Sequence, residues 1–150
     1  MKVVRDLTNG LGFADYCRQH GLTATPQRLA VFEVLSQSYE HPDAAAIYHE
    51  VRRSMPTISL DTVYRTLRSF EEKGMAVAVA TVSDRTRYDA DISGHSHFVC
   101  SVCGSVHDIS DVKIDELVAL NDVEKFGSVA SVRVELRGVC RDCSKKGRGV

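Results

Sequence analysis

Two Cys-x-x-Cys pairs place the strongest constraint on what this 150-residue chain can fold into: Cys100 with Cys103, and Cys140 with Cys143. Two thiolates from one tight turn supply half of a tetrahedral zinc site, and a second such turn completes it. The spacing therefore predicts a structural Zn²⁺ site that joins the two ends of a small C-terminal domain. Gly104 fits this interpretation, because the residue after such a turn commonly needs a positive φ. A redox Cys-x-x-Cys motif would not need the second pair, and four ordinary buried cysteines would not need the paired spacing.

The remaining composition is compatible with cysteines that stay reduced. No apolar stretch approaches the roughly 20 residues of a membrane helix, and the opening MKVVRDLTNG lacks the apolar segment of a signal peptide. We therefore expect a cytoplasmic protein without membrane association, in which cysteines serve as metal ligands rather than disulfides. Residues 1–89 carry 11 basic and 11 acidic side chains and residues 90–150 carry 8 and 9. Neither half is a basic domain, so any contact with DNA must come from the local placement of arginines.

The first half of the chain carries four helix signals and then a strand pattern. Thr25, Asp43 and Ser59 are predicted N-caps, and Gly74 is expected to end the fourth helix. The predicted helices cover 11–20, a segment from Pro26, a segment after Asp43, and 60–74. Strand-like 75–82, the turn 83–86 and strand-like 87–90 follow. This order predicts a winged helix-turn-helix DNA-binding domain over residues 1–89, with the fourth helix entering the major groove.

Apolar residues of the fourth predicted helix recur at three- and four-residue steps, which indicates one buried face. They are Leu60, Val63, Tyr64, Leu67 and Phe70. Tyr64 has two interpretations, because it could belong to this buried face or contact DNA.

Residues 90–150 are predicted to form a small α/β dimerisation domain that contains the four cysteines. Strand-like 97–100 and 105–109 flank the first cysteine turn, a helix is expected from Val112 to about Phe126, and alternating valines in 128–140 predict a further strand. The predicted fold class is therefore α+β.

Two histidines lie just before the first cysteine pair, and strand geometry separates them from it. In a strand, side chains alternate between faces, so His95 and His97 should point one way and Cys100 the other. The two histidines are thus candidates for a second metal site, although exposed histidines without a ligand role remain the alternative. Two nitrogens need further ligands. The candidate carboxylates, among which the spacing does not choose, are Asp89, Asp91 and Asp108.

From about Leu11 to Ser144, the combined motifs of the chain resemble those of the ferric uptake regulator (Fur) family of bacterial metal-dependent repressors. These motifs are TPQR at 25–28, HP at 41–42, TVYRTL at 62–67, RYD at 87–89, HSHFVCSVCG at 95–104 and GVCRDC at 138–143. Within the family the chain looks most similar to the peroxide-responsive repressors, because aspartate stands at 89 and 108 where iron-sensing members usually carry glutamate.

The resemblance implies a regulatory site for Fe²⁺ or Mn²⁺ and a sensing mechanism. The implied ligands are His41, Asp89, His95, His97 and Asp108. With iron bound, peroxide is expected to oxidise a ligand histidine, His41 or His95, after which the metal and the DNA are released. The alternative is an iron- or manganese-responsive repressor, in which metal occupancy itself is the signal.

The resemblance also implies a homodimer that binds a palindromic double-stranded DNA operator. We expect Arg65 to contact bases and Arg28 to contact phosphate, with Thr62 and Tyr64 as further DNA-binding residues. Asp61 suits the start of a helix but would repel phosphate. The protein is expected not to be an enzyme. A hydrolase or oxygenase that uses His95, His97 and a carboxylate is the enzymatic alternative, but the sequence shows no pocket motif and no positioned general base for it. A zinc-ribbon module without DNA binding would leave the fourth helix unexplained.

Overall fold

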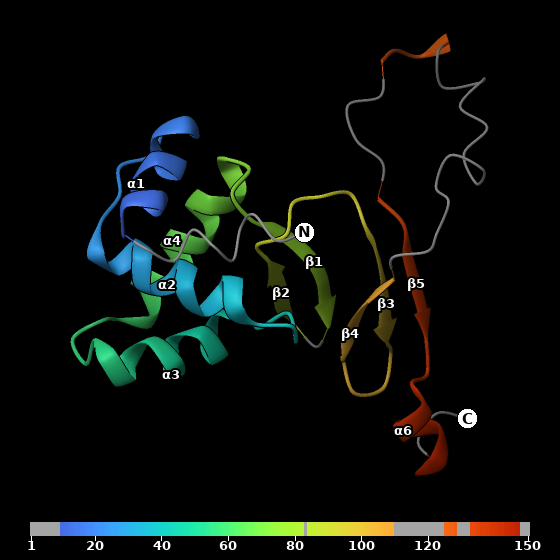
Figure 1. The fold of residues 1–150 in the computed structure, drawn as a ribbon. Helices are drawn as coiled ribbons and strands as arrows, with labels where there is room; N and C mark the ends of the chain where they lie inside the picture. Colours follow the sequence, from blue (N-terminus) through green and yellow to red (C-terminus); the bar gives the residue numbers. More distant parts are fainter. Residues whose placement is uncertain (1–9, 83, 110–124, 129–132, 148–150) are drawn as a thin grey trace. The chain divides into compact units, whose positions relative to one another are not determined.

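A computed structural model of the chain describes residues 10–82, 84–109, 125–128 and 133–147 (Figure 1). It divides into two compact units, Met1–Ser93 and Gly94–Val150. Ala90 is buried in the core of the first unit, so this unit extends past Asp89, where the sequence pattern suggested a boundary. The α+β class is confirmed. Within the described ranges, no helix combines the length and the apolar character that crossing a bilayer requires.

Helices dominate the first unit, and a β-hairpin follows them (Figure 1). The elements are α1 (Gly10–Gln19), α2 (Pro26–Gln37), α3 (Ala44–Ser54), α4 (Leu60–Glu72), β1 (Val77–Val82) and β2 (Arg85–Asp89). The two strands pair antiparallel. This is the order of a winged helix-turn-helix, with α4 in the position of the recognition helix.

The predicted helix boundaries rest on side-chain caps that the structure contains. Thr25, Asp43 and Ser59 each accept a hydrogen bond from a backbone N–H in the first turn of the helix that follows, at 3.3, 2.8 and 3.1 Å. Each such cap contributes about 1 kcal/mol. Gly74 ends α4 at φ +68°, and the next N–H, of Met75, bonds the Phe70 carbonyl at 2.8 Å. This pairing closes the helix in a Schellman motif, for which glycine is the preferred residue.

The core of the first unit is built around three phenylalanine rings from three helices. Phe13, Phe32 and Phe70 lie with ring centroids 5.1 to 6.4 Å apart. On α4, Val63, Leu67 and Phe70 are buried as predicted.

Two members of the predicted buried face of α4 do not belong to it. Leu60 is 37% exposed and Tyr64 is 52% exposed. Their three- and four-residue spacing fits a buried stripe, but both side chains lie outside the face that the other helices cover. The interpretation of Tyr64 as a core residue is therefore wrong, and its ring is available to a partner.

The second unit is organised around a three-stranded sheet. Its elements are β3 (Ser96–Cys100), β4 (Val106–Ile109), β5 (Glu135–Gly138) and the short helix α6 (Arg141–Lys145). The strand order is β4-β3-β5; β3 pairs antiparallel with β4 and parallel with β5. The predicted helix from Val112 to about Phe126 lies almost wholly outside the described residues.

Candidate metal centres

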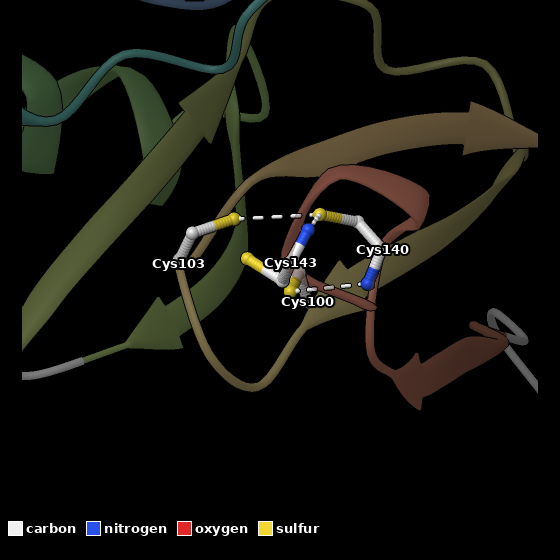
Figure 2. A group of neighbouring side chains, drawn as sticks. All are labelled: Cys100, Cys103, Cys140 and Cys143. Atoms are coloured by element: carbon white, nitrogen blue, oxygen red, sulfur yellow. Dashed lines mark hydrogen bonds between the residues drawn. The ribbon is translucent and has the colours of Figure 1, made fainter. Parts of the chain in front are cut away.

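The four paired cysteines meet at one end of the sheet in the second unit. Cys100 is the last residue of β3, Cys103 lies in the turn after it, and Cys140 and Cys143 belong to the start of α6. Figure 2 shows the four side chains pointing toward one another, and their sulfur atoms all lie within 4.8 Å. The Cys103 and Cys140 sulfurs are 3.8 Å apart. A tetrahedral zinc ion with Zn–S bonds of about 2.3 Å requires sulfur–sulfur edges of about 3.8 Å, so this arrangement fits zinc.

Local backbone geometry creates this cluster. Gly104 adopts φ +71° after the first turn, as predicted, and its N–H bonds the Cys100 carbonyl at 2.9 Å. In the second turn Cys140 is the N-cap of α6, and the Cys143 N–H donates to its sulfur at 3.4 Å. The same helix start therefore closes the turn and presents the sulfurs. Because helix N-termini favour negative charge, this position also suits thiolates.

The electrostatics of the cluster favour thiolates at one side and oppose them at the other. Backbone N–H groups of Cys103 and Cys140 donate toward the Cys100 sulfur and lower the pKa of Cys100 to about 6. The Ser105 hydroxyl, 3.3 Å from the Cys103 sulfur, lowers the pKa of Cys103. Burial raises the pKa of Cys143 to about 12. Four clustered thiolates thus need a cation to balance them. The contribution of Ser105 has no signal in the cysteine spacing.

In the first unit, His41 and Asp89 form a buried pair. The His41 ring nitrogen Nε2 lies 3.2 Å from Asp89 Oδ2, and these side chains are 3% and 12% exposed. Asp89 Oδ1 accepts a hydrogen bond from the Asp91 N–H at 2.8 Å, which fixes the orientation of the carboxylate. His41 adopts φ +49°, a left-handed conformation that costs a residue other than glycine about 1–2 kcal/mol. A strained, buried imidazole beside a carboxylate is typical of a functional position rather than of a simple core residue.

In the second unit, His95, His97 and Asp108 gather on one face of the sheet. His97 and Asp108 are directly opposite each other in the β3–β4 pairing. Asp108 Oδ1 lies 3.3 Å from His95 Nε2 and 3.6 Å from His97 Nε2, and the two imidazole centroids are 4.4 Å apart. Both histidines therefore face the same carboxylate, as strand alternation predicts. These three side chains offer two nitrogens and one oxygen to a cation.

Asp91, which the sequence left as an open candidate, and His107, the neighbour of Asp108, have other contacts. Asp91 accepts hydrogen bonds from the backbone N–H and the hydroxyl of Ser93, which closes a local turn. His107 lies 3.2 Å from the Ser105 hydroxyl, and its ring centroid is 6.4 Å from that of Phe98. Phe98 and His97 are consecutive in β3, so His107 belongs to the face opposite His97.

The predicted DNA-binding residues lie in the first unit, on α2 and α4. Arg65 is exposed and pairs with Asp61 at 2.7 Å along the helix, so its guanidinium is oriented by a carboxylate. Thr62 has its hydroxyl 2.8 Å from that of Ser59 at the start of α4. Arg28 donates from Nη1 to the Thr23 carbonyl at 2.6 Å. Tyr64 and Arg65 are exposed, whereas Arg28 and Thr62 are partly buried, so Tyr64 and Arg65 are the most accessible of the four.

Comparison with known proteins agrees with this geometry. A family model described as the ferric uptake regulator family matches residues 19–137. The peroxide operon regulator of Bacillus subtilis is 36% identical over 129 residues, which cover 86% of this chain and 89% of the relative.

Two solved structures share the fold. That of the Helicobacter pylori ferric uptake regulator has a TM-score of 0.77 at 25% identity, covering 96% of this chain and 97% of that one. That of the Campylobacter jejuni peroxide stress regulator has a TM-score of 0.68 at 30% identity, covering 87% and 96%. The resemblance inferred from the motifs is confirmed.

Proposed function

Because this chain belongs to the ferric uptake regulator family of transcriptional regulators and is not an enzyme, we propose that it is a DNA-binding repressor that senses hydrogen peroxide. The observation that carries this proposal is the pairing of imidazole with aspartate in both units. His41 contacts Asp89, and His95 and His97 contact Asp108. We expect it to act in the cytoplasm, as its reduced cysteine sites would require.

We infer that the two groups of side chains close on one regulatory ion. Together they offer three imidazole nitrogens and two carboxylate groups, a donor set that suits Fe²⁺ or Mn²⁺. Hinge closure around a bound ligand is a recurrent switching device. An ion that is bound by residues of two bodies fixes the angle between those bodies. In this proposal, metal binding by residues on both sides of Ser93 holds the protein in its DNA-binding form.

The four-cysteine cluster is proposed to hold structural Zn²⁺ rather than the regulatory ion. Four thiolates complete a tetrahedron and leave no open position for another ligand. Zinc there would connect β3 to α6 and contribute its binding free energy to the folding of the second unit.

DNA binding is proposed to use α4 in the major groove of a palindromic operator. In a homodimer, two such helices would reach successive major-groove faces about 34–36 Å apart. Tyr64 is exposed on α4, where its ring can contact a thymine methyl group or the backbone, and Arg65 can donate to guanine. Arg28 and Thr62 are proposed to contact the phosphate backbone.

Peroxide sensing is proposed to act through the ligands themselves. When bound, ferrous iron would activate peroxide for cleavage of its O–O bond. His41 or His95 is the proposed target: one peroxide oxygen would be inserted into a C–H bond of the imidazole ring and the other would leave as water, so the ring supplies the two electrons that reduce peroxide. An oxidised ring no longer presents the same nitrogen donor, so the regulatory ion is lost. The two units are then no longer held by one ion, and the operator is released.

The test is to load the zinc-containing protein with Fe²⁺, add stoichiometric peroxide and map oxygen addition by mass spectrometry. We expect one added oxygen at His41 or His95, together with loss of DNA binding. The Mn²⁺-loaded protein is the matched control and should keep both histidines intact. Oxidation confined to cysteines, with both histidines unmodified, would contradict the sensing mechanism.

A second candidate is an iron- or manganese-responsive repressor that uses the same ligands with occupancy as the signal. The similarity to the Helicobacter pylori ferric uptake regulator, with a TM-score of 0.77, favours it. The same experiment separates the two. Under this alternative, a chelator releases the operator, whereas stoichiometric peroxide leaves the histidines unmodified.

A further inference from the structure

The segment His41-Pro42-Asp43, between α2 and α3, is joined to strand β2 along its length. The Tyr88 N–H donates to the Pro42 carbonyl at 3.1 Å, and Asp43 and Arg87 form an isolated antiparallel bridge. The wing strand and the segment that contains His41 are therefore connected through the backbone, within one unit.

Three alternate side chains of β2 add contacts to the same segment. Asp89 Oδ2 lies 3.2 Å from the His41 ring, Arg87 Nη1 donates to the His41 carbonyl at 3.4 Å, and Arg85 Nη1 lies 3.4 Å from Asp43 Oδ2. Alternate residues of a strand share a face, so one face of β2 carries all three contacts. Tyr88, which points the other way, is buried in the core and holds the strand in place.

The contacts of Arg87 and Asp89 on His41 are complementary. Asp89 reaches the imidazole, whereas Arg87 reaches the peptide group of the same residue. His41 has φ +49°, and a residue in this conformation persists only when its surroundings fix it. Arg87 is half-buried, and its Nε atom is buried, so its attraction for the carbonyl is screened less than that of an exposed arginine.

We propose that Arg87 is a positioning residue for the regulatory metal site: it holds the His41 backbone in the left-handed conformation that aims the imidazole at the ion. The inference rests on the proposed function only in taking His41 as a ligand. It makes the wing strand part of the metal-sensing device, because β2 carries both Asp89 and the residue that fixes His41. Outer partners of metal ligands typically change metal affinity by about 10–100-fold.

The test is a Mn²⁺ titration of the full-length, zinc-loaded protein and its Arg87→Ala variant. We expect the dissociation constant for Mn²⁺ to rise by about tenfold or more. Arg85→Ala is the matched control, since it removes the same charge from the same face of β2 but contacts Asp43 instead of His41. Its Mn²⁺ affinity should stay within about twofold of the wild type. Arg87→Lys, which keeps the charge, serves if the alanine variant does not fold, and should show a smaller loss in the same direction.

Two further readouts separate positioning from simple stabilisation. The melting temperatures of the Mn²⁺-free Arg87→Ala and Arg85→Ala proteins should be similar, whereas only Arg87→Ala should lose most of the Mn²⁺-induced increase. The visible absorption of Co²⁺ in the regulatory site should also change in Arg87→Ala, because the geometry at His41 changes.

The outcomes distinguish this inference from the function on which it rests. If the wild type binds no second metal ion, the proposed function fails and the inference with it. If the wild type binds Mn²⁺ and Arg87→Ala binds it equally well with an unchanged Co²⁺ spectrum, the inference alone is overturned. An Arg87→Ala protein that melts far below Arg85→Ala without metal, with an unchanged Co²⁺ spectrum, would also overturn it.

Discussion

The two groups of candidate metal ligands differ in how the chain distributes them. All four cysteines belong to the second unit and come from two tight turns. By contrast, His41 and Asp89 belong to the first unit, whereas His95, His97 and Asp108 belong to the second. A ligand set within one unit can only stabilise that unit. If the residues of both units bind one ion, as proposed, occupancy of that site depends on both units, because the second unit alone supplies only three of the five proposed ligands.

The two groups also differ in the chemistry of their donor atoms. Thiolates bind zinc tightly and their binding free energy becomes folding free energy. Imidazoles and carboxylates bind Fe²⁺ or Mn²⁺ less tightly, so occupancy can follow supply. The four-cysteine cluster nevertheless includes a residue of the strand that carries a proposed sensing ligand, because β3 contains His97 and ends at Cys100. Loss of zinc should therefore disable sensing as well as folding.

The largest expected effect follows from removing a thiolate. Cys143→Ser should abolish zinc binding and unfold the second unit, since structural zinc sites in small domains contribute about 10–16 kcal/mol of apparent binding free energy. Zinc content by elemental analysis and protection of β3 amides from hydrogen exchange measure it. Cys17→Ala is the control, because Cys17 lies in the core of the first unit and should leave zinc content unchanged. Full zinc content in Cys143→Ser would remove the distinction between the two groups.

A smaller effect is expected from removing one ligand of the proposed regulatory set, whose members belong to both units. His97→Ala should weaken Mn²⁺ binding by about 100-fold or more, beyond the range for outer partners, and abolish Mn²⁺-dependent operator binding while zinc stays bound. Calorimetry measures Mn²⁺ binding, and an electrophoretic mobility shift assay measures operator binding. His107→Ala should bind Mn²⁺ like the wild type, because His107 lies on the other face of the sheet. Zinc loss in His97→Ala would mean that the two groups are not independent.

The DNA-contacting helix should respond independently of both groups. Arg65→Ala should weaken operator binding by about 1–3 kcal/mol and leave the Zn²⁺ and Mn²⁺ affinities unchanged. Arg68→Ala, on the same helix and paired with Glu72 at 2.9 Å, is the matched control and should bind the operator nearly as well as the wild type. Equal losses in both variants would indicate general charge rather than base contact by Arg65.

The smallest and most specific change lengthens one ligand. Asp89→Glu keeps the carboxylate but moves it by one methylene, and should slow histidine oxidation by about tenfold, or ~1.4 kcal/mol in the barrier, while Mn²⁺-dependent DNA binding survives. Peroxide titration of the Fe²⁺-loaded protein measures this. Unchanged peroxide sensitivity would remove the main reason for preferring peroxide sensing over iron sensing.

Much of the local structure could be predicted because it depends on near neighbours in the chain. The N-caps at Thr25, Asp43 and Ser59 and the positive φ of Gly104 follow from bonds within a few residues, and all are present. The three- and four-residue spacing of apolar residues was a less reliable guide, because it does not show which face of a helix the other elements cover. Tyr64 has the spacing of a buried residue but is exposed, because the surfaces that pack on α4 leave that side open.

The sequence by itself determined the cysteine pairs, the strand parity that separates His97 from Cys100, and the order of helices and strands. Each depends on spacing along the chain, which repeats every two residues in a strand and 3.6 in a helix. Only the tertiary structure decided that Asp108 faces both histidines, that the Cys103 and Cys140 sulfurs are 3.8 Å apart, and that Arg87 donates to the carbonyl of the strained His41. These contacts join residues from separate strands and turns. The periodicity of a strand or helix carries no information about the partners and distances that tertiary packing sets, and the cysteine spacing predicted a shared site but not its geometry.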